Sequence, residues 1–371
     1  MTSPKSSAGA NGALSPGGSR VLKRVNPFRN MQREVVMKKG MSLAEFSQVA
    51  EQAERLKHDY AVSTADLHVG IQPDRGMVLH IAGGVDKTCR LGEVAHEQLA
   101  SLVRIPRDYY NRMLVRHPGE LTDLVEMHLR KDEMPAERFI RTIDPTNGGL
   151  PKVRALLSTK YGIIDHINVI KMLADVLPHD NGAEVASVIV TERRLTVQFF
   201  FPKIEETVNR KIGDIVQAGL AFSNSEVGLG MFSAEELLRI LACLNGMIRP
   251  GVGDWKVERI HRGNPDIQVL ADHTYARVKA LPEAFANTIN LVRRADGVYI
   301  PEENMAAVVE RTRKNHALTL DEADKTLDNL YEGGRWTGWG LVNAVNQQAH
   351  QAENNRSVEL EKISGDILDT Y

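Results

Sequence analysis

Residues 185–201 read VASVIVTERRLTVQFFF, two apolar runs joined by a polar link. The first run ends at Thr191 and the second covers Leu195–Phe201, so the segment predicts a β-hairpin. In the second run one face is formed by the apolar residues Leu195, Val197, Phe199 and Phe201, and the other face by Thr196, Gln198 and Phe200. A period of two is typical of a strand with one buried face. The hairpin therefore predicts an antiparallel sheet at the centre of the chain.

Further strands are predicted on both sides of this hairpin. They are expected at 67–71, 77–81, 138–143, 153–157 and 212–223. The first two flank Gln72–Gly76 (QPDRG), whose Pro and Gly are turn residues, so a second hairpin is expected there. Residues 233–243 fit either a helix that begins near Ser233 or a buried strand.

Helical spacing dominates both ends of the chain. A capping box of Ser42 and Glu45 precedes a helix of about four turns, and Thr319 and Glu322 form a second box. Helices are also expected as three short segments within 91–132, and at 268–294, 301–315, 320–331 and 336–352. The predicted fold class is α+β, with a β-rich central antiparallel sheet flanked by helices, a helical C-terminal region and a disordered basic N-terminal arm.

Four regions follow from this pattern: a disordered basic arm (1–40), a mainly helical region with a hairpin (41–135), a β-rich core (136–267) and a helical C-terminal region (268–371). The arm holds eight Lys and Arg side chains against Glu34, or +7, and the other residues hold 38 basic and 47 acidic side chains, or −9. A basic arm can bind nucleic acid by displacing condensed counterions. The alternative is a solvated tail that keeps the chain soluble.

Several classes of protein are disfavoured. No apolar run approaches the roughly 20 residues that span a bilayer, and the N-terminus lacks a secretory signal, so no membrane partner and a cytoplasmic location in a bacterial host are expected. Gly228-Leu-Gly230 and Gly251-Val-Gly253 lack the continuation of a nucleotide-binding motif. Cys89 and Cys243 match no ligand or redox spacing. No cofactor and no metal are therefore expected.

Polar residues gather after strand-like segments and at one helix start: Asp165, His166, Asn224, Glu226, Asn245 and His261. They converge on one surface if the strand ends meet. Carboxylates and imidazoles can hold a divalent ion, as in nucleases. In an enzyme of that kind the catalytic residues would be Asp165, His166, Glu226 and His261. The structural alternative, favoured for each residue taken singly, is that these are turn and N-cap residues.

Basic and aromatic residues are interleaved in the centre of the chain. A sheet that carries Arg and exposed rings binds single strands, because phosphates meet guanidinium groups and bases stack on rings. The residues predicted to bind nucleic acid are Arg154, Lys160, Tyr161, Arg193, Arg194 and Arg262, with Arg20, Lys23, Arg24 and Arg29 in the arm. The alternative places Phe199 and Phe201 in the core and Arg193-Arg194 at a solvated hairpin tip.

Several motifs resemble a family of uncharacterised phage- and plasmid-like proteins, domain of unknown function 932. They are His96–Ala100 (HEQLA), Ile105–Met113 (IPRDYYNRM), Arg154–Asp165 (RALLSTKYGIID), Gly219 with Asn224–Gly228 (NSEVG), Cys243–Gly246 (CLNG), Trp339–Ala344 (WGLVNA) and Glu359–Gly365 (ELEKISG). The resemblance covers roughly residues 60–368. It departs at Ala234–Glu236 (AEE), where apolar strand residues are expected. It implies a home on phages, plasmids or prophages and supplies no activity or catalytic residues.

The favoured hypothesis is a DNA-binding protein of mobile-element replication or recombination, including ATP-independent annealing of single strands. Its partners would be nucleic acid, above all single-stranded DNA, and further copies of the chain in a homo-oligomer. One alternative is a metal-dependent enzyme that processes nucleic acid. The other is a non-catalytic scaffold or host-takeover factor that binds protein through the acidic helices after residue 300.

Overall fold

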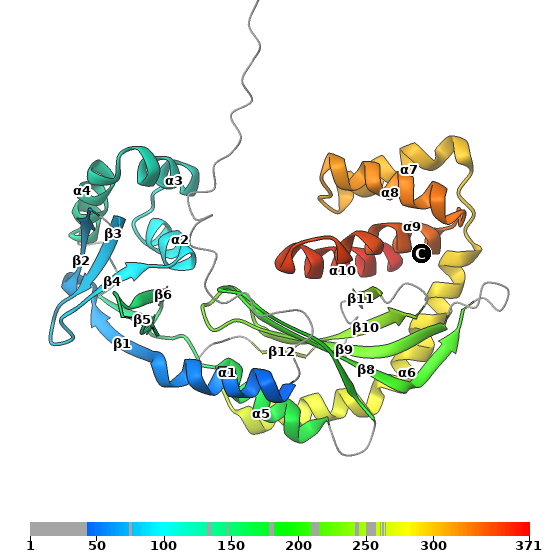
Figure 1. The fold of residues 1–371 in the computed structure, drawn as a ribbon, viewed down its shortest axis with the longest axis horizontal. Coiled ribbons are helices and arrows are strands. Elements are labelled where there is room, and N and C mark those ends of the chain that lie inside the picture. The colour runs from blue at the N-terminus through cyan, green and yellow to red at the C-terminus, as the bar shows by residue number, and fades with distance from the viewer. Residues whose placement is uncertain are drawn as a thin grey trace, which may run out of the picture.

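The computed structural model describes residues 43–371, except 74–75, 132–133, 135, 147, 178–181, 209–214, 242–244, 250–256, 260, 262 and 264. The predictions for the arm of residues 1–40, with Arg20, Lys23, Arg24 and Arg29, lie outside the described residues, as does that for Arg262. The described chain forms two six-stranded sheets, each covered by helices (Figure 1).

The first sheet has the order β1-β5-β6-β4-β3-β2 and is antiparallel except for the β4–β6 pair. Its strands are β1 (Lys57–Ser63), β2 (Leu67–Gln72), β3 (Gly76–Ile81), β4 (Lys87–Leu91), β5 (Glu137–Ile143) and β6 (Lys152–Leu157), with a 3-10 turn, η1 (Thr64–Asp66). The predicted β2–β3 hairpin is confirmed. Because β5 and β6 belong to this sheet, the predicted boundary between residues 135 and 136 falls inside it.

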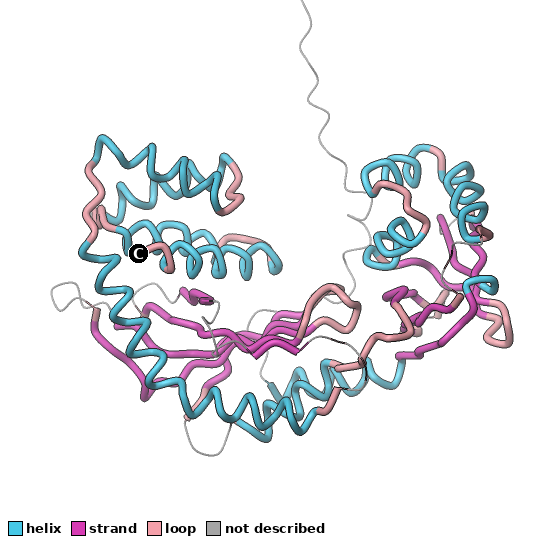
Figure 2. The backbone as a smooth tube through the Cα atoms, turned by 180° about the vertical axis from the view of Figure 1, so that it is seen from behind, coloured by secondary structure: helices cyan, strands magenta, loops and turns pink. Residues whose placement is uncertain are grey.

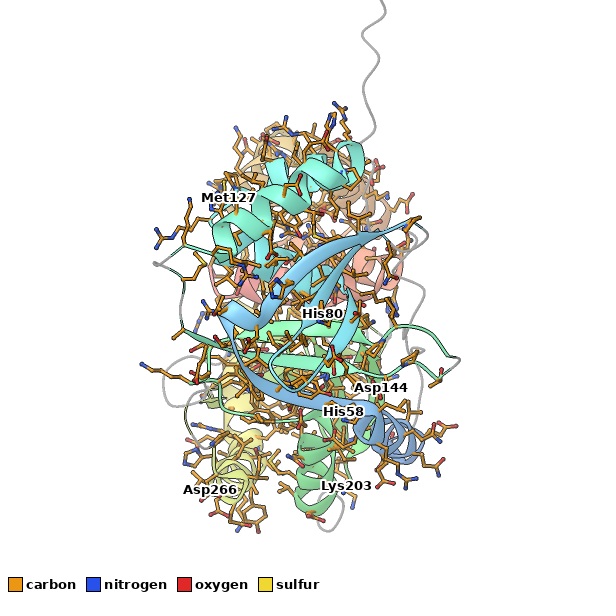
Figure 3. All side chains as sticks on the ribbon, turned by 90° about the vertical axis from the view of Figure 1, so that its left-hand side faces the viewer. His58, His80, Met127, Asp144, Lys203 and Asp266 are labelled. Atoms are coloured by element: carbon orange, nitrogen blue, oxygen red, sulfur yellow. The ribbon has the colours of Figure 1, made fainter. Side chains whose placement is uncertain are left out.

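Three short helices cover one face of the first sheet: α2 (Glu93–Leu102), α3 (Arg107–Arg116) and α4 (Pro118–Leu129). Their apolar sides bury Leu99, Tyr110 and Val125 against strand residues such as Leu79 and Ile140. The other face is more polar. On it His58 of β1 lies beside Asp144, with His58 Nε2 3.1 Å from Asp144 Oδ2 (Figure 3).

The second sheet is antiparallel in the order β11-β10-β9-β8-β7, with β12 also paired to β10. Its strands are β7 (Glu184–Val190), β8 (Leu195–Thr207), β9 (Ile215–Asn224), β10 (Phe232–Ile240), β11 (Asn245–Arg249) and β12 (Val257–Arg259). The predicted hairpin of 185–201 and the central antiparallel sheet are confirmed. The segment that fitted either a helix or a strand is the strand β10, in which the carboxylates of Glu235 and Glu236 are buried.

Helices lie on both faces of the second sheet. In Figure 1, α1 (Leu43–Leu56), α5 (His166–Val176) and α6 (Ile267–Gly297) lie below it, and Figure 2 shows them from behind. Above it lie α7 (Glu302–Asn315), α8 (Leu320–Gly333), α9 (Gly338–Asn346), a 3-10 turn η3 (Gln347–His350) and α10 (Asn354–Leu368). The predicted helical C-terminal region is therefore confirmed.

The core differs on the two faces of this sheet. One face is apolar, with Val197, Phe199 and Phe222 packed in a cluster that includes Leu281 of α6. The other carries Phe200 and Leu237 against Val358 of α10. Among the described helices, none is both long and apolar enough to cross a membrane.

Candidate functional site

A buried charged network joins the two sheets, and Glu226 is at its centre. Glu226 follows β9, in the loop that leads to β10, and is only 2% exposed. Around it lie the start of β1, the middle of β5 and β6, and the N-terminus of α5. We call this set the junction network: Lys57, Asp59, Arg141, Arg154, Asp165, His166, Asn224 and Glu226.

The Glu226 carboxylate accepts three charged or polar donors. Lys57 Nζ donates to Oε1 at 2.7 Å, and the backbone N–H of His166 donates to the same oxygen at 2.6 Å. Arg154 donates to Oε2. Burial acts against the ionised form, but Arg154 and Lys57, which both donate to the carboxylate, hold the pKa of Glu226 below its usual range. Glu226 is therefore an ionised carboxylate whose two oxygens already accept hydrogen bonds from within the protein.

Arg141 is the second centre of the network and is 1% exposed. Its guanidinium donates to both carboxylate oxygens of Asp59 at 3.0 Å and to Asp165 Oδ1 at 2.7 Å. It also donates to the backbone oxygen of Glu226 at 3.0 Å. Burial acts against the charge, but Asp165 and Asp59 overcome it and raise the pKa of Arg141. A buried guanidinium is tolerated here because four acceptor atoms surround it.

Two imidazoles flank Asn224, whose side chain is fully buried. Asn224 Nδ2 donates to the Ile164 carbonyl at 2.9 Å and lies 3.0 Å from His166 Nδ1, so that ring nitrogen is the acceptor. Burial lowers the pKa of His166 to about 4, in agreement with a neutral ring. On the other side, His261 Nε2 lies 3.1 Å from Asn224 Oδ1, and its Nδ1 lies 2.9 Å from the Gly162 carbonyl.

Tyr161 completes this side of the site. Its ring stacks on His261 with centroids 5.0 Å apart and planes 4° from parallel. Its hydroxyl donates to the Ser225 carbonyl at 2.9 Å. Tyr161 thus ties the segment before α5 to the loop after β9, and its ring is covered rather than offered to a base.

Five of the six polar residues expected to converge do so: Asp165, His166, Asn224, Glu226 and His261. Asn245 does not, because it pairs with Ile240 at the far end of the sheet from Asn224. Sequence reasoning missed Lys57 and Arg141, the two cations that hold the site together. The only signal for Arg141 was a charged residue inside an otherwise buried stretch of strand.

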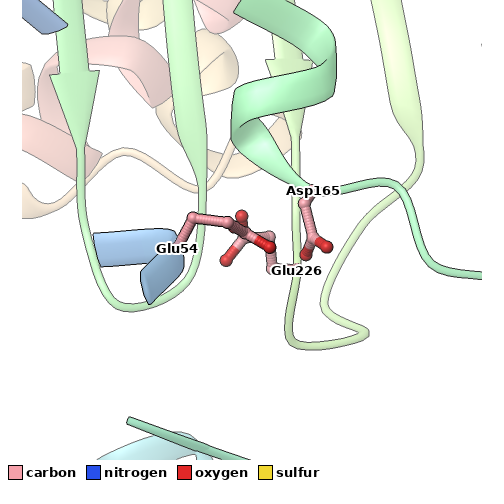
Figure 4. Close-up of side chains that lie close together, drawn as sticks. All are labelled: Glu54, Asp165 and Glu226. Atoms are coloured by element: carbon pink, nitrogen blue, oxygen red, sulfur yellow. The ribbon is translucent and has the colours of Figure 1, made fainter. Parts of the chain in front are cut away.

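Three carboxylates come close enough to suggest a metal site. Glu54, Asp165 and Glu226 each offer an oxygen, and these lie within 4.8 Å of one another (Figure 4). However, Lys57 Nζ already bridges two of them, at 2.8 Å from Glu54 and 2.7 Å from Glu226. Asp165 is paired with Arg141. The ammonium and guanidinium groups thus balance the charge that a divalent ion would otherwise neutralise.

A cavity of about 120 Å³ adjoins the junction network. Its polar wall contains Lys57, Lys152, Arg154, Glu192 and Glu226, and its apolar wall is formed by Val49, Ala50, Ala53, Ile143 and Val190. Lys152 Nζ donates to Glu192 at 2.7 Å, so most of these charges are paired. Arg154 Nη1 is buried without a hydrogen-bond partner.

Most of the described residues that were predicted to bind nucleic acid instead make contacts within the protein. Arg154 belongs to the junction network, and Arg193 is ion-paired with Glu97 of α2. Arg194 is half-buried, and of the described residues in this set only Lys160 is exposed.

The aromatic part of that prediction also needs correction. Phe199, Phe200 and Phe201 are all buried, and the guanidinium of Arg239 lies 4.9 Å from the centroid of Phe200. The described part of the second sheet therefore offers no platform of exposed rings there. The strand β8 is buried on both faces, because α10 covers the face that carries Phe200.

No family model, curated protein or solved structure matches the chain. The resemblance to the phage- and plasmid-like family therefore stays a prediction.

Proposed function

We propose that the protein binds nucleic acid, as a DNA-binding protein of mobile-element replication or recombination. The observation that carries the proposal is a basic, exposed surface on and just before α3, which we call the α3 surface: Arg104, Arg107, Asp108, Tyr109, Arg112 and Arg116. Four arginines against one aspartate give this short segment a charge of +3, whereas residues 41–371 together carry −9. Of these arginines, Arg107 is ion-paired with Glu97 of α2.

The α3 surface also offers a ring. Tyr109 is 42% exposed, and the Arg112 guanidinium lies 5.9 Å from the centroid of its ring. Bases stack on exposed aromatic rings, and arginines beside the rings neutralise phosphates. Proteins usually bind single strands without sequence preference in this way. The neighbouring Tyr110 is buried and bonded to His96, so it fixes the helix while Tyr109 faces outward.

Two features of the sequence support the same proposal. The arm of residues 1–40 has a charge of +7, which adds affinity for phosphates independent of base sequence. The family resemblance suggests a mobile genetic element. Annealing of complementary strands and assembly into a homo-oligomer belong to this proposal, because proteins of that kind act without a nucleotide motif and side by side along a strand.

Fluorescence anisotropy of a labelled single strand, compared with the matching duplex, tests the proposal at two salt concentrations. Tyr109→Ala and Arg112→Glu should weaken binding about tenfold or more. The matched control is Tyr275→Ala with Lys279→Glu on α6, where Tyr275 is 44% exposed and Lys279 Nζ lies 4.5 Å from its ring centroid. That pair has the same chemistry at another place and should leave binding unchanged.

Removal of residues 1–40 should lower the slope of affinity against salt but leave binding in place. If both pairs of variants bind equally well, the α3 surface is not the site. If the full chain binds neither strand nor duplex at low salt, the proposal fails, and the scaffold alternative is then tested by isolating protein partners.

A further inference from the structure

A second pocket, which shares no lining residue with the first, lies between the end of α2 and the strands β5 and β6. It has a volume of about 340 Å³ and is lined by Gln98, Ser101, Leu102, Arg104, Met134, Arg138 and Leu156. Two of these side chains are arginines, and none of the described residues that line the pocket is acidic. We call it the Arg138 pocket.

Arg138 has no protein partner among the described residues. Its Nε is buried without a hydrogen bond, and the side chain is half-buried. Burial lowers the pKa of this guanidinium, and no neighbouring carboxylate raises it. Arg141, three residues along the same strand, has two carboxylate partners. A half-buried cation without an anion destabilises the folded protein, so its presence needs an explanation.

The pocket continues into the α3 surface. Arg104 lines the pocket and stands just ahead of α3, where its backbone takes the left-handed conformation with a φ of 57°. Gln98 forms a fixed wall, because its Oε1 accepts from the N–H of Leu156 at 2.7 Å and its Nε2 donates to the Val227 carbonyl at 2.8 Å. The pocket is thus rigid on one side and basic on the other.

We propose that the Arg138 pocket receives a phosphate group of the nucleic-acid strand that the α3 surface binds. Arg138 supplies the guanidinium and Arg104 adds positive charge at the pocket wall. Guanidinium groups bind phosphate through paired, charge-assisted hydrogen bonds. This inference rests on the proposed function, and it adds a specific contact to a surface that otherwise acts through charge and stacking.

The test uses Arg138→Gln and Arg138→Met in the full chain, with Arg294→Gln, an exposed arginine of α6, as the control. Anisotropy of the labelled single strand gives affinity, and thermal melting with and without inorganic phosphate gives stability and occupancy of the pocket. We expect both Arg138 variants to lose about tenfold in strand affinity and any stabilisation by phosphate. Their melting temperature without ligand should stay equal to the wild type or rise, because an unpaired charge is gone.

The outcomes separate the two proposals. If the wild type binds the strand and the Arg138 variants bind equally well, the pocket is not a phosphate site while the proposed function stands. If the variants melt at lower temperature, Arg138 has a structural role and the inference falls. If the wild type binds no strand, the proposed function fails and this site fails with it.

Discussion

Lys57 and Glu226 are 169 residues apart in sequence, and Lys57 Nζ lies 2.7 Å from Glu226 Oε1. Lys57 begins the first strand of the first sheet, whereas Glu226 follows a central strand of the second. Together with Arg141 and Asp165, this pair makes the contact between the sheets a buried ionic one. Removing one partner of a buried ion pair leaves an unpaired buried charge and strongly lowers stability. Substitutions can therefore test this pair.

Replacing Glu226 with Gln should lower the free energy of unfolding by about 3–5 kcal/mol, because Arg154 is left buried without its carboxylate and Lys57 keeps only Glu54. The double variant Lys57→Met/Glu226→Gln should lose less than the sum of the single changes. Urea unfolding measures all three. Glu310→Gln on α7, which removes the ion-pair partner of Arg313 and Lys314 at the surface, is the control and should change stability little. Strict additivity in the double variant would argue against a coupled pair.

The stability of the protein should decrease as the pH is lowered from about 6.5 to about 4. Burial lowers the pKa of His96 to about 4 and that of His166 to about 4, from an ordinary value of 6.5. In this window the unfolded chain binds protons that the folded one does not, so the contribution is complete above pH 6.5 and is lost as the pH falls. The slope should approach about 1.4 kcal/mol per pH unit for each imidazole.

His96→Gln should remove the contribution of one imidazole from this slope, as measured by urea unfolding at several pH values. Replacing the exposed His117 instead is the matched control. Equal slopes for the wild type and His96→Gln would mean that His96 is already protonated in the folded protein or is accessible to solvent.

Divalent metal ions should not stabilise the wild-type protein. The carboxylates of Glu54 and Glu226 share Lys57, and Asp165 is paired with Arg141, so a cation would have to displace these groups. Melting in millimolar magnesium or manganese should match melting in chelator. A clear rise in melting temperature, with cleavage of a labelled strand, would instead support the metal-dependent enzyme.

Gly219 on β9 should not tolerate a side chain. A Cβ at this position would lie 2.5 Å from the Phe199 carbonyl oxygen and 2.8 Å from Cδ1 of the Phe200 ring. Gly219→Ala should therefore cost about 1–3 kcal/mol of stability through overpacking. Gly119→Ala in α4, where the new Cβ meets nothing within 4 Å, should be neutral or slightly stabilising. Equal melting of the two variants would show that β9 can move away from β8.

The sequence predicts the elements of this fold well where one physical signal dominates. The hairpin of 185–201 has two apolar runs around a polar link, and the Thr319–Glu322 capping box forms with both expected hydrogen bonds. The strand β10 was ambiguous because two of its residues are acidic. Glu236 is neutralised by Arg249 and Glu235 by Lys362, which local periodicity does not reveal.

The helix α10 was not predicted, since its buried face is partly polar. Glu361 on that face accepts from Gln198 Nε2 at 2.6 Å, and Gly365 fits against the Ile248 carbonyl. The expected helix at 336–352 is instead α9 followed by the turn η3.

The site could be predicted only in part, because local patterns mark its turn-like residues but not their charge partners. Turn-like residues after strands do gather, but their charge partners come from elsewhere: Arg141 reaches Asp59 over 82 residues and Asp165 over 24. No spacing rule links such partners. The basic surface on α3 lies in a segment that the sequence predicts as one of three short helices and as a motif of the family resemblance, with no signal for a binding surface.

The long sequence separation between Lys57 and Glu226 also has a consequence for synthesis of the chain. At about 5–20 residues per second, a ribosome needs roughly ten to thirty seconds to make the residues between them. During that interval the first sheet can form its own strand pairs, and Lys57 and Arg141 can pair with Glu54 and Asp59. Their contacts to the carboxylate and the carbonyl of Glu226 cannot form until that residue has been made. The first sheet therefore completes its buried polar contacts only after the loop that follows β9 has been synthesised.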